Sequence, residues 1–157
     1  MDAAYRCFCE FLDGEGLAYQ AENEEGDRRI YLGFSSNELP LHAVFVFETK
    51  AQRIYVGSLL PVTAKEETLD ELIMAVLRVN QVVAVGAFCV NPESGACTFE
   101  SNETLVGVDG FSTDYAARVI ASTFTVLKQF GGQLAAVADG TLAADEIETG
   151  ASEEEDA

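Results

Sequence analysis

The sequence predicts a single α+β domain in the order helix, antiparallel strands, helix, β-hairpin, helix. Three observations support this prediction. Apolar residues recur at helical spacing in three segments, β-branched and aromatic residues dominate the region between the first two, and a hairpin turn precedes the third. With 157 residues, of which 48% are hydrophobic, the chain is long enough to bury one sizeable core.

The first part of the chain predicts a helix followed by a sheet. The helix is expected over residues 3–12, because Phe8 and Leu12 recur at helical spacing and a glycine-containing cluster at residues 13–16 ends the pattern. The segments that follow are rich in β-branched and aromatic residues, which favour strands. Strands are expected over residues 17–22, 29–34, 41–48 and 53–59.

The second helix is expected to begin after Thr63 as its N-cap, because Thr63 and Glu66 match the capping-box pattern S/T-x-x-E. Its apolar face is expected to contain Leu69, Leu72, Ile73, Val76, Leu77, Asn80 and Val83. Asn80 lies in the middle of this face, where an unpaired amide would cost about 1–3 kcal/mol. We therefore expect Asn80 to form hydrogen bonds with neighbouring backbone.

The hairpin after this helix can be predicted down to its register. If residues 91–95 form the turn, Phe88 faces Phe99, and Cys89 and Cys97 lie on opposite sides of the sheet. A register in which the two cysteines faced each other would place polar and apolar residues on the same face, so it is rejected.

The third helix is expected to start after Ser112, whose hydroxyl can accept a hydrogen bond from an unpaired N–H of the first turn. Its buried face is expected to contain Ala116, Val119, Ile120, Thr123, Leu127 and Phe130. Gly131 and Gly132 are expected to end or kink this helix, with residues 133–139 forming one further helical piece.

The charge of the chain restricts its partners. With 27 acidic and 9 basic residues, the net charge is -18, which would repel nucleic-acid backbones and anionic membrane surfaces. The sequence has no apolar run of about 18 residues that could span a membrane. Its start also lacks the basic and apolar regions of a signal peptide. We therefore expect no nucleic-acid or membrane partner and a cytoplasmic location.

The acidic end is expected to be separate from the folded domain. Residues 145–157 carry seven acidic residues, no basic residue and one large apolar residue, Ile147. Such a segment buries too little surface to offset the entropy lost on ordering. The domain is therefore expected to span residues 1–144, followed by a flexible tail.

Four cysteines and one histidine are the candidates for metal binding or catalysis. Cys7 and Cys9 are two positions apart on the expected first helix and His42 is remote from them, which does not match a zinc site. The sequence also lacks a nucleophile elbow and a glycine-rich phosphate loop, so no catalytic, metal-binding or cofactor-binding residue is predicted. The alternative is a small cysteine-dependent enzyme that uses a Cys/His pair.

A family resemblance lies in LRVNQVVAVGAFCVNPESGACTFES, residues 77–101. This segment has an Asn near the end of the central helix, a Gly-x-Phe strand and an Asn-x-x-x-Gly hairpin turn. In these features it resembles the YbjN family of bacterial proteins, which is similar in fold to the class I type III secretion chaperones. The resemblance extends in pattern over residues 1–144. It implies a non-enzymatic protein-binding or regulatory role, such as regulation of sensory transduction, and no catalytic residues.

The sheet is expected to offer a surface for a protein partner. Strand alternation points Tyr31, Val44, Val46 and Tyr55 away from the helices, and an apolar stretch there indicates that something covers this face. The cover is either the chain itself, through its first strand, a loop or the last helical piece, or a client segment or second subunit.

The second helix offers another candidate surface. Met74 and Val82 fall on its otherwise polar side, and Val79 falls off the middle of its apolar face. A second apolar strip of this kind would suit a homodimer contact.

Overall fold

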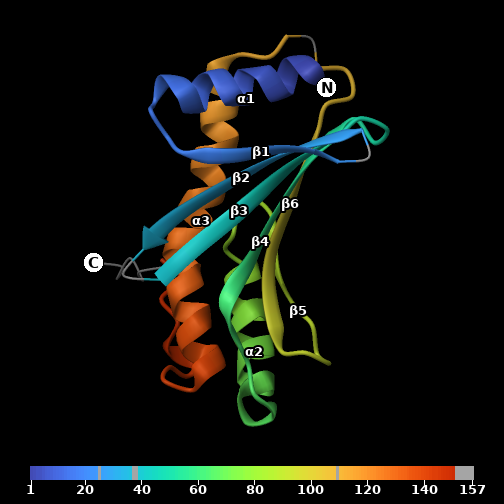
Figure 1. Cartoon of the computed structure of the whole chain (residues 1–157). Coiled ribbons are helices and arrows are strands. Elements are labelled where there is room, and N and C mark those ends of the chain that lie inside the picture. Colours follow the sequence, from blue (N-terminus) through green and yellow to red (C-terminus); the bar gives the residue numbers. More distant parts are fainter. Residues whose placement is uncertain (25, 37–38, 109, 151–157) are drawn as a thin grey trace, which may run out of the picture.

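In the computed structural model, which describes residues 1–24, 26–36, 39–108 and 110–150, an antiparallel sheet carries helices on one face (Figure 1). The described strands are β1 (Tyr19–Glu24), β2 (Asp27–Ser36), β3 (Leu39–Glu48), β4 (Arg53–Thr63), β5 (Ala87–Val90) and β6 (Ala96–Thr104). The described α-helices are α1 (Asp2–Gly14), α2 (Leu69–Asn80) and α3 (Thr113–Asp139). The strand order is β1-β2-β3-β4-β6-β5. The predicted fold class and order of elements are confirmed.

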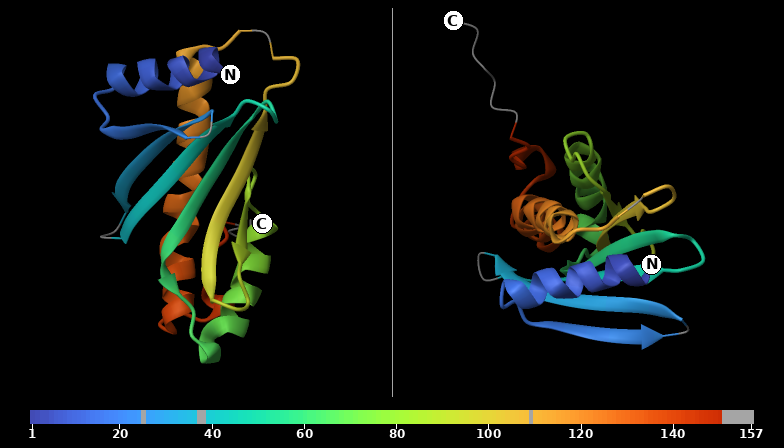
Figure 2. Two further views of the ribbon diagram at one scale, coloured as in Figure 1. Left: turned by 45° about the vertical axis from the view of Figure 1, so that its right-hand side comes forward. Right: turned by 90° about the horizontal axis from the view of Figure 1, so that it is seen from above.

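The core lies between the helices and one face of the sheet. Alternate residues of β3 and β4 point toward the helices, and Phe45, Phe47 and Ile54 are fully buried there, as the alternation predicted. Phe8 of α1 packs against Phe47, with ring centroids 5.1 Å apart. Figure 2 shows that α1, α2 and α3 lie on the same side of the sheet.

The β5–β6 hairpin has the predicted register. Phe88 pairs with Phe99, and Cys89 pairs with Thr98. Cys97 is buried and Cys89 is exposed, so the two cysteines lie on opposite sides of the sheet.

The start of α2 differs from the prediction. Thr63 is the last residue of β4, because pairing with β6 resumes at Thr63 after a register shift and extends the strand. A 3-10 turn, η1 (Glu66–Thr68), precedes the helix. The Thr68 hydroxyl accepts a hydrogen bond from the Lys65 N–H at 3.0 Å and donates one to the Ala138 carbonyl of α3 at 2.7 Å. The capping role predicted for Thr63 is therefore wrong, and the Thr68 hydroxyl instead closes the turn that precedes α2 and ties it to α3.

The buried side of α2 is also rotated relative to the prediction. Leu77 was expected in the core and is 54% exposed, whereas Val79 was expected off the centre of the apolar face and is fully buried. The reason is that α2 packs against both β5 and α3, so two neighbours set its buried side.

Helix α3 starts as predicted and ends later. The Ser112 hydroxyl accepts a backbone N–H of the first turn at 3.3 Å. The helix then continues through Gly131 and Gly132, so the prediction that they could end it is wrong, while residues 133–139 are helical as expected. A Cβ on Gly131 would lie 3.5 Å from side-chain atoms of Leu41 and Leu60, which shows how closely the helix packs on the sheet at this point. This packing holds Gly131 in helical conformation.

The folded part of the chain extends beyond the predicted boundary. Ile147 is only 4% exposed and belongs to the core. The Glu148 N–H donates to the Gln133 side chain at 2.7 Å, and the Gln133 amide donates to the Glu148 carbonyl at 3.3 Å. One buried side chain and these hydrogen bonds therefore hold Ile147 and Glu148 against the domain, beyond the expected boundary at residue 144. The rest of the predicted tail, residues 151–157, lies outside the described residues.

Candidate protein-interaction surface

One face of the sheet points away from all three helices (Figure 2). We call it the open face and define it by nine of the outward-pointing residues on β2, β3, β4 and β6, namely Tyr31, His42, Val44, Val46, Tyr55, Gly57, Leu59, Thr98 and Glu100. Strand β1 is an edge strand of the same sheet, and α3 packs on the opposite face. Within the described residues, neither the first strand nor the last helical segment covers the open face, so these two of the expected covers are not the ones found, and a loop or a partner remains.

Four of the residues predicted to bind a partner form the centre of the open face. Tyr31 is the cross-strand partner of Val44, and Val46 is that of Tyr55. All four side chains are half-buried. They lie together because alternate residues of paired strands point to the same side of a sheet.

The structure adds Leu59 to this centre. Its side chain is 61% exposed, and it lies on the same side of β4 as Tyr55 because the two are four residues apart in a strand. The sequence prediction missed Leu59, although continuing the alternation from Tyr55 would have found it.

Two glycines make room for side chains that lie flat on the open face. A Cβ on Gly33 would lie 2.9 Å from Nδ1 of His42, and a Cβ on Gly57 would lie 2.9 Å from the hydroxyl oxygen of Tyr55. The His42 and Tyr55 rings therefore lie over the glycine backbone. The result is a shallow surface with aromatic rings on its floor.

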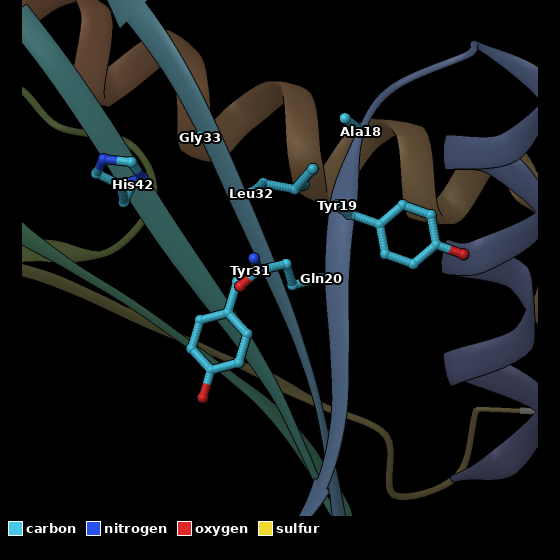
Figure 3. Close-up of a pocket in the computed structure, with 7 residues that line it drawn as sticks. All are labelled: Ala18, Tyr19, Gln20, Tyr31, Leu32, Gly33 and His42. Atoms are coloured by element: carbon cyan, nitrogen blue, oxygen red, sulfur yellow. The ribbon is translucent and has the colours of Figure 1, made fainter.

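Two adjoining hollows occupy this surface. One, of about 480 Å³, lies beside β1 and β2, where Figure 3 shows Tyr19 directed toward α1 and the Tyr31 ring on the other side of the strand. The second, of about 320 Å³, is lined by Tyr55, Leu59 and other residues of β3 and β4. Tyr31 and His42 border both hollows. The two hollows therefore adjoin each other on the open face.

The arginines on this side of the sheet already have acidic partners. Arg29 of β2 forms an ion pair with Glu24, and Arg53 of β4 forms one with Glu48. Glu100 has no ion pair among the described residues. The open face therefore presents the Glu100 carboxylate, uncompensated among the described residues, beside its apolar centre.

Glu100 affects its neighbours electrostatically. It is the cross-strand partner of Gly57, and its carboxylate accepts a long hydrogen bond from the Thr98 hydroxyl at 3.5 Å. Burial raises the pKa of Tyr55, and the negative charge of Glu100 raises it further. The same two causes, in the same order, raise the pKa of the Cys89 thiol.

The geometry does not favour a Cys/His pair. His42 on β3 and Cys89 on β5 are separated by β4 and β6, which is about 14 Å at the usual spacing between strands. Burial raises the pKa of the Cys97 thiol to about 12. Thiols with raised pKa values stay protonated at neutral pH and are poor nucleophiles. Among the described residues, no group of three or more potential ligands is arranged to hold a metal ion.

The other two predicted residues lie elsewhere, with Met74 on α2 and Val82, which was predicted to be part of this helix, in the turn that follows it. Met74 is 54% exposed and Val82 is 43% exposed. Because α2 packs on the helical side of the sheet, they do not form one site with Tyr31, Val44, Val46 and Tyr55.

No family model matches the sequence, and a search of the curated proteins found no similar one. No helix in the described part of the chain is long and apolar enough to cross a membrane. The fold and the surface together define an α+β domain with an apolar sheet face that the described chain leaves uncovered.

Proposed function

We propose that this chain is a non-enzymatic protein-interaction module that binds a protein partner through the open face. The observation that carries the proposal is the apolar centre formed by Tyr31, Val44, Val46, Tyr55 and Leu59 on a sheet whose other face is occupied by helices. A solvated sheet face is usually polar at these positions. Exposed apolar patches that contain tyrosines are typical of binding surfaces.

The sequence resemblance supports the same proposal. We propose a bacterial regulator or chaperone-like protein of the YbjN type, similar to the class I type III secretion chaperones, that acts in the cytoplasm. The net charge of -18 favours a protein partner over nucleic acid or an anionic membrane. Homodimerisation through Met74 and Val82 is a separate proposal, which sedimentation over a wide range of concentrations would test.

A cysteine-dependent enzyme is the less supported alternative. It would need a thiolate close to a proton acceptor, whereas Cys89 has a raised pKa and lies three strands from His42.

The experiment compares proteins retained from an extract of the source cells by three forms of the tagged full chain. The first is the parent, and the second carries Val46→Lys and Tyr55→Asp on the open face. The third carries the same changes at Val106 and Val108, which are 66% and 39% exposed and lie outside the open face. We expect the parent and the third form to retain the same partner and the second form to lose it, with all three folded by circular dichroism.

Retention of the same proteins by all three forms would contradict the proposal. If the open-face double variant unfolds, the single change Leu59→Lys repeats the test, because the Leu59 side chain is largely exposed already. Partner retention by a folded Leu59→Lys variant at the parental level would then count against the open face.

A further inference from the structure

We infer that the open face binds a basic, apolar-containing segment of the partner, in which Lys or Arg neighbours aliphatic side chains. The inference rests on the proposed function and specifies the chemistry of the partner. Two features of the open face support it, namely the apolar hollow and the uncompensated carboxylate beside it.

The hollow over β3 and β4 suits an aliphatic side chain. Its volume is about 320 Å³, and Val44, Tyr55 and Leu59 contribute apolar surface to it. Moving the 61% exposed Leu59 side chain out of water against a partner's apolar residue would be favourable. The shallow shape favours a segment laid across the strands, because this hollow adjoins the one beside β1.

The charge of Glu100 determines which kind of apolar segment the open face prefers. Glu100 is the cross-strand partner of Gly57 on the open face. Its carboxylate has no ion pair among the described residues. Arg29 and Arg53, on the same side of the sheet, already pair with glutamates, so they offer little attraction to an acidic partner. A Lys or Arg of the partner placed over Glu100 would form an ion pair while its neighbour enters the hollow.

A second copy of the chain is a poor occupant of this face. Each copy carries a net charge of -18 and would bring its own Glu100 into the contact. Like charges placed opposite each other across an interface oppose association. Electrostatic complementarity therefore points to a basic protein segment as the occupant of the open face and away from self-association through this face.

The test measures the binding of three short fluorescent peptides to the full chain by anisotropy. One alternates leucine with lysine, one alternates leucine with glutamate, and one alternates serine with lysine. We expect the leucine–lysine peptide to bind about tenfold or more tightly than either of the others, because only it has both the charge and the apolar side chains. Its affinity should fall as salt is added.

Matched variants separate specific binding from general attraction to an acidic protein. Glu100→Gln should weaken binding of the leucine–lysine peptide by about two- to fivefold, the usual range for an exposed ion pair. Glu67→Gln, which removes an exposed carboxylate in η1, should leave it unchanged. Leu59→Ser should weaken binding, whereas Val106→Ser should not. Backbone amide shifts on binding should be concentrated at Gly57 and Thr98.

Several results would overturn the inference. Equal binding of the lysine and glutamate peptides would remove the role of charge, and equal effects of Glu100→Gln and Glu67→Gln would show that the attraction is not local. Self-association that is abolished by Leu59→Lys would make a second copy the occupant. The capture experiment remains independent of these outcomes: an acidic partner lost on Val46→Lys and Tyr55→Asp would support the proposed function while contradicting this inference.

Discussion

The Asn80 side chain forms two hydrogen bonds with the backbone of Phe88, in the manner of a neighbouring strand. Its amide nitrogen donates to the Phe88 carbonyl at 2.9 Å, and its amide oxygen accepts the Phe88 N–H at 2.8 Å. Strand β5, which contains Phe88, is an edge of the sheet. Asn80 therefore ties the end of α2 to this edge and occupies backbone groups that another strand could otherwise use.

Replacing Asn80 by Ala should lower the free energy of unfolding by about 1–3 kcal/mol, because both Phe88 groups lose their partner in a part-buried site. Urea denaturation measures this change. Asn102→Ala is the matched control, since Asn102 is exposed on β6, and it should stay within about 0.5 kcal/mol of the parent. Equal losses in the two variants would contradict the role of Asn80.

The structure predicts that Thr68, and not Thr63, stabilises the turn that leads into α2. Thr68→Ala removes the hydrogen bonds to the Lys65 N–H and the Ala138 carbonyl and should cost about 1–2 kcal/mol. Thr63→Ala, at the exposed end of β4, should cost less than about 0.5 kcal/mol. A larger loss at Thr63 in thermal or urea unfolding would restore the capping box predicted from the sequence.

Gly95 and Gly107 have nearly the same backbone conformation, with φ of 71° and 74°, and differ in their surroundings. A Cβ on Gly95 would lie 2.2 Å from the Ala64 carbonyl oxygen, whereas no atom lies within 4 Å of a Cβ on Gly107. Gly107→Ala should therefore cost only the conformational strain, about 1–2 kcal/mol. Gly95→Ala should cost at least about 1–3 kcal/mol more, since backbone must move. Similar unfolding midpoints for the two variants would be the contrary result.

Docking of residues 145–150 should depend on Ile147. Ile147→Ala removes a side chain that is 4% exposed and should lower the free energy of unfolding by about 2 kcal/mol or more. Asp145→Ala is the control. It removes only an exposed carboxylate and keeps the backbone carbonyl of residue 145 that accepts a hydrogen bond from Arg78, so the free energy of unfolding should change little. Parental stability of Ile147→Ala would show that this segment contributes nothing to the fold.

Burial of Cys97 makes the fold sensitive to alkaline pH. The pKa of its thiol is raised from 9.0 to about 12, so the folded protein holds this proton more tightly than the unfolded chain. This contribution to stability is complete below about pH 9 and is lost as the pH rises toward 12. Cys97→Ala should lower stability at neutral pH and flatten the decline above pH 9, whereas the control Cys7→Ala should keep the decline. Unfolding curves that decline in parallel for both variants would exclude Cys97 as the cause.

Predictions that depended on residues close together in the sequence were the most successful. The hairpin register follows from the turn at residues 91–95 and the alternation beside it, so Phe88 and Phe99 could be paired without knowledge of the rest of the fold. The Ser112 cap and the outward positions of Tyr31 and Val44 were also local deductions. The apolar centre of the candidate surface could therefore be predicted in part.

Predictions that depended on distant neighbours were less successful. Nothing near Thr63 indicates that β6 will extend β4 through it, and nothing near Gly131 indicates that Leu41 and Leu60 will support a continuous helix. The composition around Ile147 suggested a free tail, because the surface that buries this residue comes from other parts of the chain.

The sequence by itself determined the type and order of the elements, because helical and strand periodicity and hairpin turns depend on neighbouring residues. It also determined the acidic charge that limits the partners. Only the tertiary structure decided that β4 pairs with β6, that all three helices pack on one face, and that Glu100 lies across from Gly57 beside the apolar centre. These features depend on contacts between segments far apart in the chain, where many arrangements satisfy the same local pattern and the shared core selects one of them.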